Sequence, residues 1–227
     1  MTPAAGLAPG GAVDKTLLRD AATVVLLRDD SPEGPRVLMG QRGASAAFMP
    51  SKFVFPGGAV DDGDGATRFA RPLRASVRAE LANRSPRPPE AIAAAALREL
   101  AEETGQIIAR PSASSPSWPG FEGLAPDADP LRFIFRAITP PGRPRRFDAR
   151  FLMADATAVL TDPDDFSKAE DELSHLQWVP LSRARALDMP FITEVVLAEI
   201  AAITDGTDAP GVPFFDNSGE ASVFLRL

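Results

Sequence analysis

The stretch Arg98-Glu99-Leu100-Ala101-Glu102-Glu103-Thr104-Gly105 (RELAEETG) closes the clearest helical pattern in the chain. Upstream, Pro88 and Pro89 suit the entrance of a helix, because proline is tolerated in the first turn. Gly105 suits the left-handed conformation that ends many helices. We predict a helix from Glu90 to Thr104.

Three carboxylates, Glu99, Glu102 and Glu103, lie three or four positions apart or adjacent, so a helix places them within an arc of about 100°. Beside them runs an apolar stripe of Ala96, Leu100 and Ile107. Clustered like charges next to a buried stripe repel one another unless a cation neutralises them. Mg²⁺ takes oxygen ligands and often binds substrate phosphates as well. The pattern favours a phosphate-chemistry site; the alternative is a solvated, glutamate-rich helix face.

The same stretch resembles the core of the Nudix box, G-x5-E-x7-R-E-U-x-E-E-x-G-U, in which U is a bulky apolar residue. Glu90 lies eight positions before Arg98, as the pattern requires, and Phe55-Pro56-Gly57-Gly58 is similar to the FPGG that opens the box. This resemblance implies an α/β/α sandwich around a mixed β-sheet. It also implies hydrolysis of a diphosphate linkage with Mg²⁺ or Mn²⁺.

Two departures from the family pattern lie in the box. Gly58 precedes Glu90 by 32 positions instead of six, which implies an insertion of 26 residues, and Gln106 stands at the final apolar position. An insertion here is typical of the branch similar to peroxisomal coenzyme A diphosphatases. Three further stretches resemble that branch: Gln41-Arg42 through Met49-Pro50, Pro144 to Phe151, and Met189 to Thr193. The resemblance covers roughly residues 20 to 203.

The resemblance assigns roles to the residues of the box. It implies that Glu99 and Glu103 bind the metal and that Glu102 is a further ligand or the catalytic base. The carbonyl of Gly58 is a fourth candidate ligand, and Arg98 is expected to orient a neighbouring carboxylate. For Arg98 the alternative is an i,i+4 surface pair with Glu102.

A further acidic residue is expected from a loop before a late strand. Glu170, Asp171 and Glu172 precede such a strand, and we select Glu172 as the catalytic candidate; the alternative is that all three are solvated loop charges. His175, the single histidine, is predicted to be structural or exposed.

The arginines of the insertion suggest a second hypothesis. Arg71, Arg74 and Arg78 are spaced to share a helical face and could grip an extra phosphate of the substrate, such as the 3′-phosphate of coenzyme A. The alternative is a solvated face, or a face paired with acidic groups or a second subunit. Arg42 and Arg146 are also predicted to contact the substrate.

The remaining periodic segments predict one mixed α/β domain. It comprises residues 21–227 with the insertion at about 59–89, after a flexible segment 1–20. Strands are expected at 22–27, 36–41, 52–55, 131–138, 146–153, 176–179 and 221–227, and a helix at 191–203. Residues 66–83 are helix-like but interrupted by Pro72, and residues 110–130 are expected to be a connection.

The amino-acid composition favours some classes of binding partner over others. The 227 residues carry a formal net charge of −7 and no cysteine, which disfavours nucleic-acid polymers and excludes disulfides and thiolate ligands. No apolar run is long enough to span a bilayer, so a cytoplasmic location without membrane contact is expected. The expected substrate is a small nucleoside diphosphate derivative, with coenzyme A or acyl-coenzyme A preferred. ADP-ribose, other nucleotide sugars or dinucleotides, and a non-catalytic nucleotide-sensing role stay open, as does a homodimer.

Overall fold

The computed structural model describes residues 17–44, 46, 49–219 and 221–227. Its main sheet is mixed and runs in the order β11-β10-β7-β8-β1-β2-β3, with β4 paired to β1 and β9 paired to β2. The strands of this sheet are β1 (Leu18–Arg28), β2 (Arg36–Arg42), β3 (Phe53–Val54), β4 (Gly57–Ala59), β7 (Arg132–Ile138), β8 (Arg146–Asp155), β9 (Leu173–Pro180), β10 (Pro213–Asp216) and β11 (Val223–Arg226). A small second sheet pairs β5 (Ala109–Pro111) with β6 (Leu124–Pro126).

Strand β1 occupies the centre because its side chains are apolar on both faces. Alternate residues of a strand point to opposite faces, and Val24 and Leu26 belong to one buried cluster whereas Val25 belongs to the other. The parallel partner β8 divides in the same way, with Leu152 in the first cluster and Met153 in the second. A strand buried on both faces needs a layer of helix on each side.

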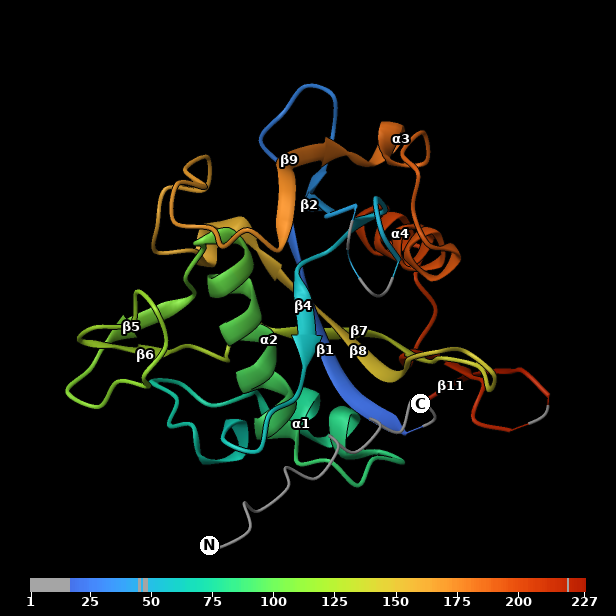
Figure 1. Cartoon of the computed structure of the whole chain (residues 1–227), viewed down its shortest axis with the longest axis horizontal. Coiled ribbons are helices and arrows are strands. Elements are labelled where there is room, and N and C mark those ends of the chain that lie inside the picture. Colours follow the sequence, from blue (N-terminus) through green and yellow to red (C-terminus); the bar gives the residue numbers. More distant parts are fainter. Residues whose placement is uncertain (1–16, 45, 47–48, 220) are drawn as a thin grey trace, which may run out of the picture.

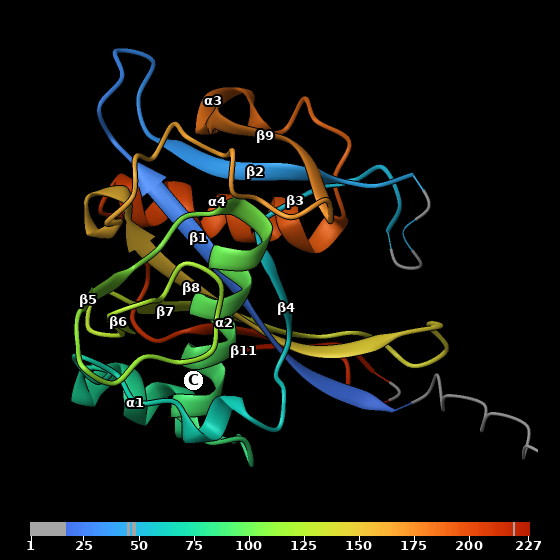
Figure 2. The ribbon, with the colours of Figure 1, turned by 60° about the vertical axis from the view of Figure 1, so that its left-hand side comes forward.

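Helices supply these two layers. Helix α2 (Pro89–Thr104) packs on the cluster of Val24 and Leu26, and α4 (Phe191–Thr204) packs on the cluster of Val25. Figure 1 and Figure 2 show α2 and α4 on opposite sides of β1. The shorter helices are α1 (Ala75–Ala82) and α3 (Leu181–Ala184), and the 3₁₀ turns are η1 (Asp64–Ala66) and η2 (Ala156–Ala158). The predicted α/β/α sandwich is confirmed.

The long helix begins and ends where its sequence predicts. Pro89 occupies its first turn, and Gly105 caps it with φ of 72° while its N–H donates to Ala101. The helix ends at Thr104, so Ile107 is not part of the stripe predicted on it. Ile107 packs instead in a small cluster with Ala109 and Phe121, next to the second sheet.

Two predicted boundaries are corrected. Strand β1 begins at Leu18 and pairs with β8 from there, so residues 18–20 are not flexible; residues 1–16 lie outside the described residues. The predicted connection 110–130 contains strand pairing between β5 and β6. Residues 66–83 contain one short α-helix, α1, which begins after Pro72, in agreement with the interruption predicted there.

A buried charge network ties the segment between α1 and α2 to the sheet. Arg136 donates twice to Asp148, at 2.8 and 2.7 Å, and to the carbonyl of Arg84 at 3.0 Å. Arg150, whose side chain is 1% exposed, donates to Asp20 and to Ser85 Oγ. These bonds fix the loop that leads into α2.

In the part of the chain that the structure describes, none of the helices has the length and hydropathy needed to cross a membrane.

Candidate active site

Helix α2 places its three glutamates next to strand β4, at different depths. The side chain of Glu102 is 26% exposed and that of Glu99 is 14% exposed, whereas Glu103 is buried at 2%. The depth follows from the helical spacing, because the residues turn progressively from solvent toward the sheet. The cluster is therefore half inside the protein and is not a solvated helix face.

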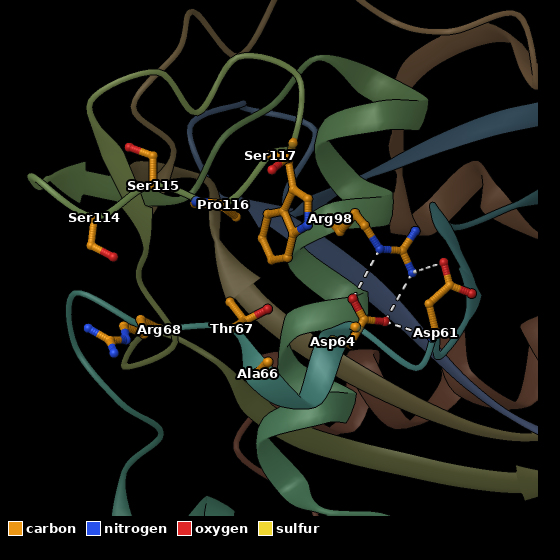
Figure 3. A pocket seen from close by; sticks show the side chains of 12 residues that line it. Asp61, Asp64, Ala66, Thr67, Arg68, Arg98, Ser114, Ser115, Pro116 and Ser117 are labelled. Carbon is orange, nitrogen blue, oxygen red and sulfur yellow. Dashed lines mark hydrogen bonds and ion pairs between the residues drawn. The ribbon is translucent and has the colours of Figure 1, made fainter.

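Arg98 joins this cluster to a second acidic group (Figure 3). Its Nη1 donates to Glu99 Oε1 at 2.7 Å and to Glu102 Oε2 at 3.1 Å. Its Nε and Nη2 each donate to the buried carboxylate of Asp64 at 3.1 Å. The i,i+4 pair with Glu102 is present, but it belongs to a buried guanidinium that holds two of the glutamates at once.

Asp64 was not predicted as part of the site. It lies in η1, in the acidic run Asp61-Asp62-Gly63-Asp64 that follows the FPGG sequence. That run was the available signal, but only the fold shows which of its members turns inward to Arg98.

Glu103 is held in place by one oxygen only. The backbone N–H of Gly57 donates to its Oε2 at 2.7 Å, whereas its Oε1 is buried and accepts no hydrogen bond from any residue that the structure describes. Burial, together with the charges of Glu99 and Glu172, raises the pKa of Glu103 to about 8, although the Gly57 N–H opposes the shift. An ionised carboxylate here has an unmet need for a positive partner.

Glu99, which lies next to Gly58, is also a desolvated carboxylate with a raised pKa. Burial, together with the charges of Glu102 and Glu172, raises its pKa to about 7, although Arg98 opposes the shift. A Cβ on Gly58 would overlap the Glu99 carboxylate. Glycine at this position lets the strand approach the carboxylate directly.

This donor set fits a divalent cation bound through oxygen. Desolvated carboxylates and a buried acceptor without a donor are both satisfied by such an ion. Glu99 and Glu103 could hold it, with Glu102 and the Gly58 carbonyl as further oxygens. Over the described residues, no three His, Cys, Asp or Glu side chains are already arranged as a metal cage. The Arg98 guanidinium and the Gly57 N–H occupy oxygens that a cation would take.

A loop brings a fourth glutamate to the cluster; we call residues 161–172 the acidic loop. Glu172 accepts a hydrogen bond from Arg42 Nη2 at 2.9 Å, and its charge raises the pKa of both Glu99 and Glu103. The N–H of Glu170 donates to the carbonyl of Glu102 at 2.8 Å. Glu172 and Arg42 therefore both lie beside the box glutamates, as members of one ion pair.

Gln106 anchors this loop, a role that the sequence did not reveal. Its buried side chain donates to the carbonyls of Asp162 at 3.1 Å and Asp165 at 2.9 Å, and it accepts from Thr161 Oγ1 at 2.9 Å. An apolar residue at this final box position could make none of these bonds. The departure from the family pattern thus has a structural explanation.

The helical face predicted for Arg71, Arg74 and Arg78 does not form, because only Arg78 lies within α1. Arg71 precedes α1 and binds Asp127 and Asp129, whereas Arg74 caps α1 and donates to the carbonyl of Leu131. Arg78 pairs with Glu90 at 2.5 Å. Each guanidinium already has a partner within the protein.

Two other predicted residues can be placed. Arg146 donates to the carbonyl of Thr139 at 3.1 Å, within the β7–β8 hairpin. His175 is exposed, as predicted.

Comparison with known proteins agrees with this geometry. A family model described as NUDIX domain matches residues 85–199, slightly more than half of the chain. The chain is 30% identical to putative nudix hydrolase 7 of Caenorhabditis elegans, covering 71% of this chain and 51% of that protein. It is 32% identical to acyl-coenzyme A diphosphatase NUDT19 of Gallus gallus, covering 49% of this chain and 39% of that one. The chain thus spans about half, or less, of the length of these curated relatives.

A solved structure is similar over almost its whole length. The NUDIX hydrolase from Alicyclobacillus acidocaldarius superimposes with a TM-score of 0.62 at 31% identity, covering 82% of this chain and 92% of that one. The sequence motif, the helix-borne carboxylates and these similarities lead to one conclusion: the chain belongs to the Nudix family.

Proposed function

We propose that this protein is a Nudix diphosphatase, which hydrolyses the diphosphate linkage of a nucleoside diphosphate derivative with the help of Mg²⁺ or Mn²⁺. The observation that carries the proposal is the desolvated pair of Glu99 and Glu103, of which the second has a buried oxygen with no donor in the described part of the chain. Family membership and the names of the relatives support the same reaction.

The role proposed for each side chain follows from how deeply it is buried. Glu99, Glu102, Glu103 and the Gly58 carbonyl would hold the cation, which when bound supplies positive charge to the diphosphate and acidifies bound water. Arg98 keeps Glu99 and Glu102 oriented through its Nη1. A carboxylate accepts the proton of the attacking water; of the acidic groups at the cluster, Glu102 and Glu172 are the more exposed.

The preferred substrate is coenzyme A or acyl-coenzyme A. This proposal rests on the insertion of 26 residues in the box and on the acyl-coenzyme A diphosphatase among the relatives. ADP-ribose, other nucleotide sugars and dinucleotides share the diphosphate and are the alternatives. A nucleotide-sensing role without turnover would use the same carboxylates for binding alone.

Chromatographic product analysis separates these functions. The purified protein with Mg²⁺ or Mn²⁺ is incubated in parallel with coenzyme A, ADP-ribose, NADH and a dinucleoside polyphosphate. We expect 3′,5′-ADP and 4′-phosphopantetheine from coenzyme A, released faster than any other product. Faster cleavage of another substrate would reject the coenzyme A proposal alone. Metal-dependent nucleotide binding without cleavage of any of them would favour sensing.

A further inference from the structure

A cleft of about 540 Å³ opens beside Arg98, and apart from Arg98 and its acidic partners the residues that line it have no assigned role (Figure 3). It lies between the segment that follows β4 and the connection between β5 and β6. The lining residues that matter here are Thr67, Arg68, Arg98, Ser114, Ser115 and Ser117. The sequence predicted the segment between β5 and β6 only as part of a connection.

Arg98 connects this cleft to the carboxylate cluster. The same guanidinium that lines the cleft donates to Glu99 at 2.7 Å and to Glu102 at 3.1 Å. A molecule whose diphosphate lies at the glutamates could therefore extend a neighbouring group into the cleft. The cleft is placed to bind a second part of a substrate.

The two arginines that line the cleft differ in whether they have acidic partners. Arg98 is surrounded by acidic partners, with Asp64 at 3.1 Å and Asp61 at 3.5 Å in addition to the two glutamates. Arg68 is exposed, and its guanidinium has no hydrogen bond or ion pair anywhere in the described part of the chain. Figure 3 places Arg68 at the opposite end of the cleft from Asp61.

Hydroxyl groups line the cleft, and Figure 3 shows Ser114 and Ser115 on the side of Arg68 and Ser117 nearer Arg98. Thr67, Ser114, Ser115 and Ser117 line it, and among the residues described by the structure none of these hydroxyls has a hydrogen-bond partner. A guanidinium with nearby hydroxyl donors is a typical partner set for phosphate oxygens.

A second cleft, of about 360 Å³, provides an internal contrast. It also contains arginines, but Arg132 pairs with Asp208 at 2.7 Å and Arg74 donates to the carbonyl of Leu131 at 3.0 Å. Its arginines are already engaged within the protein, and Arg98, which joins the first cleft to the glutamate cluster, does not line it.

We propose that the cleft at Arg68 binds a phosphomonoester group of the substrate, separate from the diphosphate that is cleaved. The inference rests on the proposed diphosphatase function and adds a specificity-determining residue to it. Arg68 supplies the charge, and the threonine and serine hydroxyls supply neutral donors. This site replaces the arginine face that the sequence predicted on the insertion.

The test uses substrate pairs that differ by one phosphomonoester: coenzyme A with dephospho-coenzyme A, and NADPH with NADH. For a pair that is cleaved, we expect the wild-type protein to prefer the phosphorylated member. Arg68→Ala should raise KM for that member by about 10-fold or more, the effect of one charge-assisted contact. kcat, and the KM of the other member, should stay unchanged, because Arg68 does not touch the reacting phosphorus. Arg185→Ala, which removes another exposed arginine, is the control for net charge.

Direct binding separates a failure of this inference from a failure of the proposed function. The dissociation constants of 3′,5′-ADP and 5′-AMP are measured by calorimetry for the wild type and for Arg68→Ala. Selective weakening of 3′,5′-ADP would support the cleft even if no substrate were hydrolysed. Equal effects on both members of every pair, or no effect of Arg68→Ala on either, would overturn the inference while leaving the diphosphatase proposal intact.

Discussion

At the scale of single residues, Glu103 explains why these glutamates differ from an ordinary acidic helix. Its Oε2 accepts the Gly57 N–H while its Oε1 has no donor, at a position that is 2% exposed. A buried carboxylate without a charge partner destabilises a fold. Its presence here is understandable if the group serves a bound cation.

Replacing Glu103 by Gln tests this interpretation. The amide oxygen can still accept from Gly57, but the charge for the cation is lost, so we expect diphosphate hydrolysis to fall on the order of 100-fold or more. The metal-free variant should be at least as stable as the wild type, because the buried charge is gone. Initial rates at saturating Mg²⁺ and thermal melting curves measure the two effects. Near-normal turnover of the variant would contradict a role of Glu103 in binding the cation. Glu122→Gln, at an exposed site, is the control.

At the scale of elements, the site depends on the contact between α2 and the acidic loop. Gln106 binds two loop carbonyls and the Thr161 hydroxyl, and the Glu170 N–H donates to Glu102. The acidic loop is thus joined to the box at Glu102 and at its last residue, Gln106. Both the position of Glu172 and the exposure of Glu102 follow from this junction.

We expect Gln106→Leu, which restores the apolar residue of the family pattern, to loosen the acidic loop. Two carbonyls lose their donor, which costs about 1–3 kcal/mol of stability where those groups stay buried. Amide hydrogen exchange should increase in residues 161–172 and stay unchanged in the middle of α2. The exposed Gln177→Leu is the matched control. Unchanged exchange in the loop would show that Gln106 does not anchor it.

At the scale of the whole molecule, the buried charge network joins three strands of the sheet to the loop before α2. Arg150 is the most enclosed member, with contacts to Asp20, Asp148 and Ser85. Removing one buried cation from such a network leaves its carboxylates less fully compensated, although Asp148 keeps Arg136 and Asp20 keeps Arg87. The network therefore links the position of α2 to the centre of the sheet.

Arg150→Met should lower the free energy of unfolding by about 3–5 kcal/mol, because Asp20 and Asp148 lose a buried cation. Urea denaturation monitored by circular dichroism measures this loss. Arg145→Met, at an exposed arginine outside the network, should change it by less than about 0.5 kcal/mol. A small effect of Arg150→Met, equal to that of the control, would contradict a structural role for the network.

The stability of the whole protein should also depend on pH through the glutamates. Glu103 has a pKa of about 8 in the fold against an ordinary value of 4.5, so the folded state binds more protons than the unfolded state between these values. The free energy of unfolding of the metal-free protein should therefore fall as pH rises through this window. Glu99, with a pKa of about 7, adds to the same trend.

Thermal melting in a chelator from pH 5 to pH 9 measures this slope. Glu103→Gln should show a shallower decrease, because the variant no longer exchanges that proton. Mg²⁺ should raise the melting temperature of the wild type more at pH 8.5 than at pH 6, since protons and cation compete for the same carboxylates. The same slope in both proteins would rule out Glu103 as its source.

The local sequence determined the helix with its glutamates, the proline entrance, the Gly105 cap and the central apolar strands. These features depend on backbone geometry and on periodicity over a few residues, which a sequence displays directly. Family membership followed from the same short motif.

Only the tertiary structure decided which charged residues are available to a ligand. Arg71 pairs with Asp127, which is 56 positions away in the sequence, and Arg98 pairs with Asp64, which is 34 positions away. Arg68, in the same insertion as Arg71, finds no partner within the described residues and lines a cleft instead. Pairings of this kind depend on how distant segments meet in the fold, and charge spacing along the chain does not encode them.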